Sequence, residues 1–116
     1  MDGDDLVSVR AFQIGVYTNY DNALRVADRN NGIVVSDSDV FRVYVAILSS
    51  DEAVEVMRTY YDSIGLNYYL KDIMVSKDFL SSVKSTEDLL IISSSDTYNV
   101  INLSVLSKYE EFLWVI

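Results

Sequence analysis

The sequence predicts one α+β domain in which four strands and two helices follow each other in the order β-α-β-β-α-β. The chain of 116 residues has the size of a single domain, and 50% of its residues are hydrophobic. Two segments, residues 11–32 and 40–65, each run from a β-branched and aromatic stretch through a polar turn into an amphipathic helix. This duplication predicts the split βαβ arrangement of ferredoxin-like folds, with a four-stranded antiparallel sheet and two helices on one face.

The first segment predicts a strand followed by a short helix. Within residues 8–17, Phe12, Ile14 and Val16 alternate with Ala11, Gln13 and Gly15, which is the period of a half-buried strand. The helix after it has a stripe of small residues, Ala23, Val26 and Ala27, and an Asp21–Arg25 pair at i,i+4 spacing. Asn30-Asn31-Gly32 should end this helix, and residues 33–36 should form the second strand.

The second segment repeats the plan with larger side chains. Val43, Val45 and Ile47 alternate in the third strand. The following helix has a continuous apolar stripe made of Ala53, Val56, Met57, Tyr60, Tyr61 and Ile64. Ser49 and Glu52 have the spacing of a capping box, and Gly65 suits the left-handed residue that ends a helix. Residues 68–75 complete the sheet as its fourth strand.

The pattern changes after Ser76. Residues 77–83 and 87–92 predict two short helices capped by Ser76 and Ser85. A further helix should begin near Asp96, although alternation over residues 101–105 also fits a strand. We therefore divide the chain into a disordered acidic start (1–6), a domain (7–76) and a helical extension (77–116). The extension should pack on the helical side or an edge of the domain and leave the other sheet face open.

Composition and charge exclude several classes of function. Nine basic against 18 acidic residues give a formal charge of −9, which repels a phosphate backbone, so we expect no nucleic-acid partner. Without His or Cys, the chain cannot use thiolate or imidazole catalysis, Ser-His-Asp triads or zinc–cysteine sites. The acidic residues show neither the spacing of a calcium loop nor a selected catalytic pair. We therefore expect no enzyme, no metal and no cofactor.

Short motifs in the two segments carry a resemblance to a known family. The first segment contains Gln13-Ile14-Gly15-Val16-Tyr17 followed by Asn22-Ala23, and the second contains Phe41-Arg42-Val43 followed by Ala53. Together they resemble the SPOR (sporulation-related repeat) domain, a bacterial peptidoglycan-binding module. The resemblance covers about residues 7–75 and departs from the family where Ala46-Ile47-Leu48 replaces a Gly-Pro-Phe turn. Residues beyond Ser76 have no counterpart in the family.

The resemblance implies an RNP-like sandwich whose open sheet face binds glycan strands that amidases have stripped of stem peptides. Such domains recruit division or sporulation proteins to septal peptidoglycan. The implied partners are therefore glycan strands and septal or sporulation proteins. The implied location is the extracytoplasmic side of the bacterial cell envelope, with membrane contact only through an anchor that this chain does not contain.

Strand alternation would place chemically suitable side chains on that open face. Gln13 and Arg42 offer hydrogen-bond donors to sugar oxygens, and the ring of Tyr44 can pack on a sugar. Gly15 and Ala46 would leave a shallow groove. The expected glycan-binding residues are Gln13, Gly15, Tyr17, Arg42, Tyr44 and Tyr69. Whether Tyr68 or Tyr69 faces the open sheet stays undecided, because a one-residue shift in register exchanges them.

A second hypothesis comes from another class of function. The replaced Gly-Pro-Phe turn and the added C-terminal segment favour a ferredoxin-like regulatory or protein-interaction domain that binds no glycan. The two hypotheses differ in one structural expectation. If residues 77–116 cover the open sheet face, glycan strands lose access to it and the interaction role is favoured.

Overall fold

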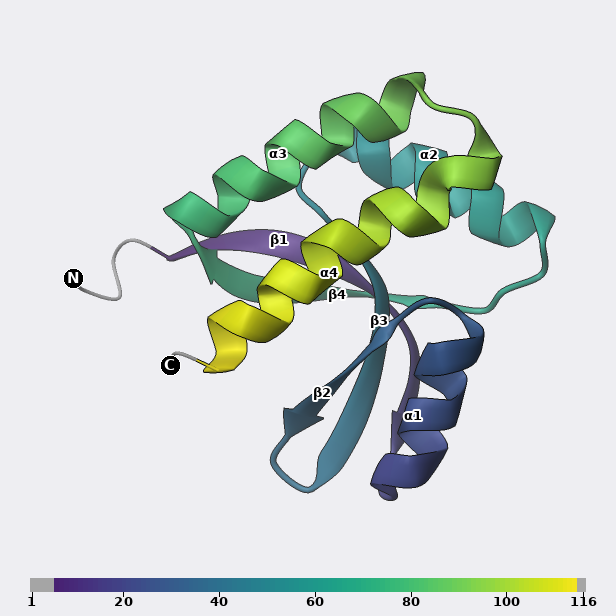
Figure 1. The fold of residues 1–116 in the computed structure, drawn as a ribbon, viewed down its shortest axis with the longest axis vertical. Helices are drawn as coiled ribbons and strands as arrows, with labels where there is room; N and C mark the ends of the chain where they lie inside the picture. Colours follow the sequence, from purple (N-terminus) through teal and green to yellow (C-terminus); the bar gives the residue numbers. More distant parts are fainter. Residues whose placement is uncertain (1–5, 115–116) are drawn as a thin grey trace.

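The computed structural model describes residues 6–114 and confirms the β-α-β-β-α-β order (Figure 1). The elements are β1 (Leu6–Tyr17), α1 (Tyr20–Arg29), β2 (Ile33–Asp37), β3 (Val40–Leu48), α2 (Asp51–Ser63), β4 (Tyr69–Ser76), α3 (Lys77–Ile92), η2 (Ser95–Thr97) and α4 (Tyr98–Trp114). Of the predicted disordered start, residues 1–5 lie outside the described part of the chain, and Leu6 already belongs to β1.

The four strands form one sheet in the order β2-β3-β1-β4, and every neighbouring pair is antiparallel. This is the ferredoxin-like order, so the predicted fold class is confirmed. A two-residue turn joins β2 to β3, since Asp37 pairs with Val40. Ser38 adopts a positive φ of 57° there, as such tight hairpins require.

Local hydrogen bonds explain where α1 and α2 begin and end. Asn19 caps α1 by accepting a hydrogen bond from the amide of Asn22 (3.1 Å). Ser50, not the expected Ser49, caps α2 by accepting from the amide of Ala53 (3.1 Å). Gly65 follows α2 with a φ of 72°, the left-handed conformation predicted for it. The expected Asp21–Arg25 pair is not among the ion pairs of the described residues.

Both of these helices pack on the same side of the sheet, the α1–α2 face, as predicted. Ala23 and Ala27 of α1 pack against Val43 of β3. The larger buried residues of α2, Ala53, Val54, Met57 and Tyr61, pack against strand residues that include Phe12, Ala46 and Leu48. The small buried side chains of α1 and the mostly larger ones of α2 therefore fill the space between these two helices and the sheet.

The C-terminal segment forms a pair of helices, and two expectations about it need correction. Residues 77–92 make one continuous helix, α3, rather than two short ones. Ser85 is no cap, because it lies inside α3 and its hydroxyl donates to the carbonyl of Ser81 (3.1 Å). Ser76 does cap α3, accepting from the amide of Phe79 (3.1 Å), and α4 confirms the predicted helix near Asp96. No helix within residues 6–114 is long and apolar enough to cross a bilayer.

The extension covers the sheet face that was expected to be open. In Figure 1, α3 and α4 lie side by side and α4 crosses in front of the sheet. The residues that share this buried cluster are Val9, Ala11, Ile33, Val35, Tyr44, Ile47, Ile73, Val75, Phe79, Val83, Val105, Leu106 and Tyr109. The strand side chains on this α3–α4 face are mostly apolar, so hydrophobic burial drives the helices onto it. The expectation that the extension packs elsewhere and leaves this face free is wrong.

Candidate functional site

Two β-bulges divide the expected glycan site between the two faces of the sheet. Between β1 and β3, Phe12 pairs with Ala46, Gln13 with Tyr44, and Gly15 with Val43, so that Val45 and Ile14 are extra residues. A bulge reverses the side to which the following residues point. Gln13, Arg42, Tyr44 and Tyr69 therefore share the α3–α4 face, whereas Gly15, Tyr17 and Ala46 belong to the α1–α2 face.

Gly15 and Tyr17 form a local packing pair rather than part of a sugar groove. A Cβ atom on Gly15 would lie 2.5 Å from Cε2 of the Tyr17 ring, so only glycine lets the ring lie there. Tyr17 itself packs against the cluster of Ala23, Ala27 and Val43 beneath α1. The expected position of these two residues on the open face is wrong, because they lie on the α1–α2 face.

The two central residues of the expected site are buried. Gln13 is 8% exposed and Tyr44 is 2% exposed. The Tyr44 ring packs against the ring of Tyr109 in α4, with 6.3 Å between their centroids. A glycan strand cannot reach either side chain while α4 stays in place.

The outer residues of the site remain accessible. Arg42 is half-buried, and Tyr69 is 64% exposed. The neighbouring Tyr68 turns inward and packs its ring 5.1 Å from that of Phe12. This answers the question of register, because Tyr69 pairs with Gln13 and lies on the same face as Tyr44.

Asp37, Arg42 and Gln13 form a polar row across three neighbouring strands of the sheet, and their side chains are hydrogen-bonded to one another. Arg42 donates from Nε to the Asp37 carboxylate (2.7 Å) and from Nη1 to the side-chain oxygen Oε1 of Gln13 (3.0 Å). Burial, helped by the neighbouring Tyr109, raises the pKa of Tyr44 to about 12, although Arg42 opposes this shift. Burial and then Asp37 also raise the pKa of Tyr109. Hydrogen bonds fix the side chains of the polar row, and the Tyr44 ring packs against Tyr109 of α4. The polar row is therefore a packed part of the sheet face that α4 covers.

Glu87 is a key residue that the sequence analysis missed. It is 4% exposed, and its carboxylate accepts hydrogen bonds from the Ser49 amide (2.6 Å), the Ser49 hydroxyl (2.6 Å) and the Ser50 amide (2.9 Å). The positive end of the α2 dipole favours this anion. Glu87 therefore fastens α3 to the start of α2. Its position on the apolar stripe of Phe79, Val83 and Leu90 was the available signal.

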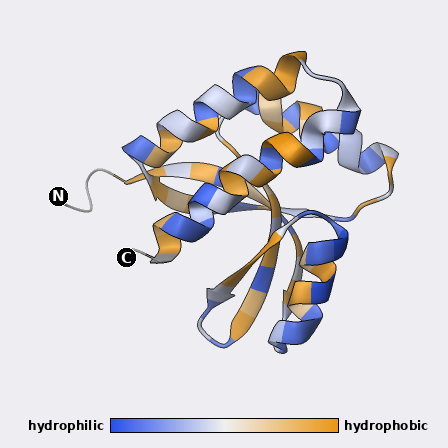
Figure 2. Ribbon diagram, in the orientation of Figure 1, coloured by the Kyte–Doolittle hydropathy of each residue, from blue (hydrophilic) through white to orange (hydrophobic). Residues whose placement is uncertain are grey.

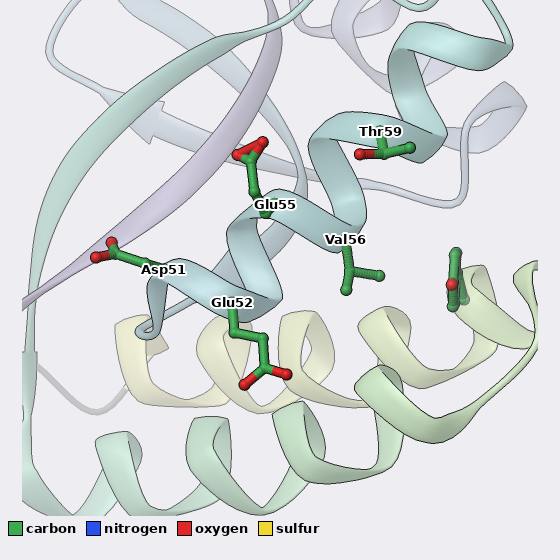
Figure 3. A pocket seen from close by; sticks show the side chains of 6 residues that line it. Asp51, Glu52, Glu55, Val56 and Thr59 are labelled. Carbon is green, nitrogen blue, oxygen red and sulfur yellow. The ribbon is translucent and has the colours of Figure 1, made fainter.

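A broad groove runs along α2 beside the start of α4 (Figure 3). Its acidic half has a volume of about 660 Å³ and is lined by Asp51, Glu52, Glu55, Val56, Thr59 and Tyr98. A second hollow of about 390 Å³ shares Val56, Thr59 and Tyr98 and continues past Tyr60 to Ile64. Figure 3 shows Glu52 and Val56 projecting from the same side of α2. We call the combined feature the α2 groove.

The groove contains side chains that the sequence analysis assigned to the core. Val56 and Tyr60 are only half-buried, and Ile64 is 56% exposed. The buried stripe of α2 is centred instead on Ala53, Val54, Met57 and Tyr61. The helix thus has a second apolar row, in which Val56 and Tyr60 pack against the edge of the core and stay partly exposed in the groove. Spacing alone does not separate the two rows, because together they make one wide stripe.

The acidic side chains of the groove differ in whether they form ion pairs. Asp51 is engaged by Arg10 (2.7 Å) and Glu55 by Arg58 (3.3 Å), whereas Glu52 has no ion pair with any residue among 6–114. Within the same described range, no three acidic side chains converge closely enough to hold a metal ion. The α2 groove is therefore an open surface on which carboxylates lie next to apolar and aromatic side chains.

The fold and this surface define a ferredoxin-like α+β domain with helices on both faces of its sheet. Comparison of the chain with family models, curated proteins and solved structures finds no match. Its function therefore has to be inferred from the arrangement of its own residues.

Proposed function

We propose that this chain is a non-catalytic protein-interaction domain of ferredoxin-like fold that does not bind glycan strands. The observation that carries the proposal is the covered sheet face. Gln13 and Tyr44, the centre of the expected glycan site, are 8% and 2% exposed beneath α3 and α4. Opening that face would expose the apolar cluster that includes Val9, Ile73 and Val75, which makes displacement of the cover by a sugar polymer unfavourable.

The helical surface supports an interaction role. Near the turn between α3 and α4, Ile92 is 81% exposed and Val100 is 74% exposed. Asp96 is the only charged residue between Leu89 and Ser107. Figure 2 shows the hydrophobic end of α3 beside this turn. Large exposed apolar side chains in a segment with a single charge favour contact with another protein.

One observation favours a second candidate function. Arg42 and Tyr69 stay accessible at the edge of the covered site, and both belong to the set expected to bind glycan. A donor and an aromatic ring could still hold a short stretch of sugar polymer there. This residual glycan site is the alternative that the experiment has to separate from the proposal.

Sedimentation with purified sacculi, with and without prior amidase treatment, tests the choice. We expect the protein to stay in the supernatant in both cases, while a glycan-binding SPOR domain used as positive control sediments with the treated sacculi. Retention that needs amidase treatment and is lost in the double variant Arg42→Ala, Tyr69→Ala would overturn the proposal.

Site-specific photo-crosslinking in the native host supplies the positive half of the test. A photoreactive amino acid at Thr59, in the α2 groove, should give a discrete protease-sensitive adduct. The same amino acid at Asp28, an exposed position on α1, should give none. Equal labelling from both positions, or no adduct from Thr59, would count against a protein-interaction surface on α2.

A further inference from the structure

We infer that the α2 groove binds a basic amphipathic helix from a partner protein, with its cationic end beside Glu52 and Glu55 and its apolar end beside Tyr60 and Ile64. This inference rests on the proposed function and names the chemistry of the partner at that site. It follows from the arrangement of the lining residues, the charge of α2 and the length of the groove.

The lining residues follow the helical repeat. Glu52, Val56, Tyr60 and Ile64 stand four residues apart and form one row along α2. Glu55, Thr59 and Ser63 form the adjacent row, and Tyr98 from α4 makes the opposite wall. Rows at four-residue spacing are the ridges and grooves into which a second helix packs. An amphipathic helix is therefore the segment whose shape matches this surface.

The apolar part of the groove offers an anchor. Tyr60 packs edge-on against Tyr98, with 5.3 Å between ring centroids, so the aromatic wall is held in position. Ile64 is 56% exposed at the end of this row. An apolar side chain of the partner placed between these residues would remove their surface from water, which is the main source of affinity in helix-in-groove complexes.

The other end of the groove selects the charge of the partner. α2 carries Asp51, Glu52, Glu55 and Asp62 against the single cation Arg58. Glu52 has no ion pair with the described residues, and the Asp51 side chain is 95% exposed despite its pair with Arg10. The whole chain has a formal charge of −9, so it attracts cationic segments and repels anionic ones. Lysine or arginine side chains are the complement of this end.

The dimensions set the length of the segment. α2 has 13 residues, which at 1.5 Å per residue is about 20 Å. A partner helix of about 14 residues spans that distance. Its apolar residues would occupy one half of the contact face and its cationic residues the other half.

A synthetic peptide tests the inference. The probe is a fluorescently labelled helix of about 14 residues, with leucines on one face and lysines in one half, measured by anisotropy against the full chain. Two matched probes accompany it: the same sequence with glutamate for lysine, and a scrambled sequence of equal composition. We expect only the first probe to bind, with affinity that falls as salt is added.

Charge reversal on the protein locates the site. The variant Glu52→Lys, Glu55→Lys should weaken binding of the lysine probe roughly tenfold or more, because like charges then face each other. The control Asp21→Lys, Asp28→Lys makes the same change in net charge on exposed positions of α1 and should change the affinity less than about twofold. Glu52→Gln, Glu55→Gln keeps the helix propensity of α2 and should show a smaller loss in the same direction.

A second pair of variants tests the apolar end. Ile64→Ser in the groove should weaken the probe, whereas Leu24→Ser, at an exposed leucine of α1, should not. Equal losses from the α1 and α2 charge variants, or binding of the glutamate probe, would overturn the inference. If the lysine probe fails while Thr59 still crosslinks to a protein, the chemistry of the partner is wrong but the proposed function stands. Loss of both results removes the proposed function as well.

Discussion

The two faces of the sheet are both buried, but they are buried by different kinds of chemistry. The α1–α2 face is filled by apolar side chains such as Phe12, Val43 and Leu48. The α3–α4 face also holds Gln13 and Tyr44, and its polar row reaches out to Asp37 through Arg42. A polar side chain under a helix is tolerated when it has a partner, and the side-chain oxygen of Gln13 has one in Arg42. The second face therefore combines the residue types of a ligand-binding sheet with the packing of a core.

The faces also differ in how their helices are held. α1 and α2 are tied to the sheet by the chain itself, because each connects two of its strands. α3 and α4 follow the last strand, and their attachment depends on side-chain packing and on the hydrogen bonds of Glu87 to Ser49 and Ser50. The βαββαβ unit is topologically complete without the C-terminal helices. Their buried side chains nevertheless belong to the same core cluster as those of the strands.

Removing α3 and α4, the cover of the α3–α4 face, should have the largest effect on stability. A chain ending at Ser76 would expose the buried side chains of Val9, Ile47 and Val75, and burial of such a residue contributes about 1.5–3 kcal/mol. Several of these together approach the whole stability of a small domain, about 5–15 kcal/mol. We expect this chain to aggregate or to lose its cooperative thermal transition in circular dichroism. A soluble, cooperatively folded chain would show that the two faces are not equivalent parts of one core.

Breaking the Glu87 contact should have an intermediate effect. Glu87→Ala leaves the Ser49 and Ser50 amides without their acceptor and should lower the free energy of unfolding by about 1–3 kcal/mol. The control is Asp88→Ala at the exposed neighbouring position, for which we expect a change within about 0.5 kcal/mol. Urea unfolding of both variants measures the difference. Equal values would mean that α3 is held by apolar packing alone.

The smallest effect should appear only at high pH. Burial raises the pKa of Tyr44 to about 12 on one face and raises the pKa of Tyr61 on the other. Above pH 10 the unfolded chain releases these protons while the folded chain keeps them, so stability is full below pH 10 and falls as the pH rises toward 12. The urea midpoint should therefore drop between pH 9 and pH 11.5. The drop should be smaller in Tyr44→Phe and in Tyr61→Phe.

The order of elements was predictable because local signals repeat. Alternation marked the strands, apolar periodicity marked α2, and Ser76 and Gly65 marked helix ends that the structure confirms. These signals depend on neighbours within a few positions, so they can be read from one sequence.

The side of the sheet to which each residue points was not predictable, because it depends on pairing between residues that are distant in the sequence. Ile14 in β1 and Val45 in β3 are bulge residues because neither has a partner on the opposite strand. Nothing in the sequence around either residue marks it as unpaired. The single helix α3 was missed for a similar reason. Ser85 is of a residue type that often caps helices, but its hydroxyl donates to the Ser81 carbonyl inside α3, and Glu87 contacts residues about 40 positions away. The candidate groove was missed because Val56 and Tyr60 match a core pattern.

The position of the cover in the chain has a consequence for synthesis. β1 to β4 leave the ribosome before α3 and α4, which span residues 77–114, about 40 residues. At about 5–20 residues per second, the ribosome needs roughly 2–8 s to add them. During that interval the apolar side chains that later form the α3–α4 face have no helices to pack against them. Every new molecule therefore passes through a state that chaperones, or a neighbouring nascent chain, can bind before the domain closes on itself.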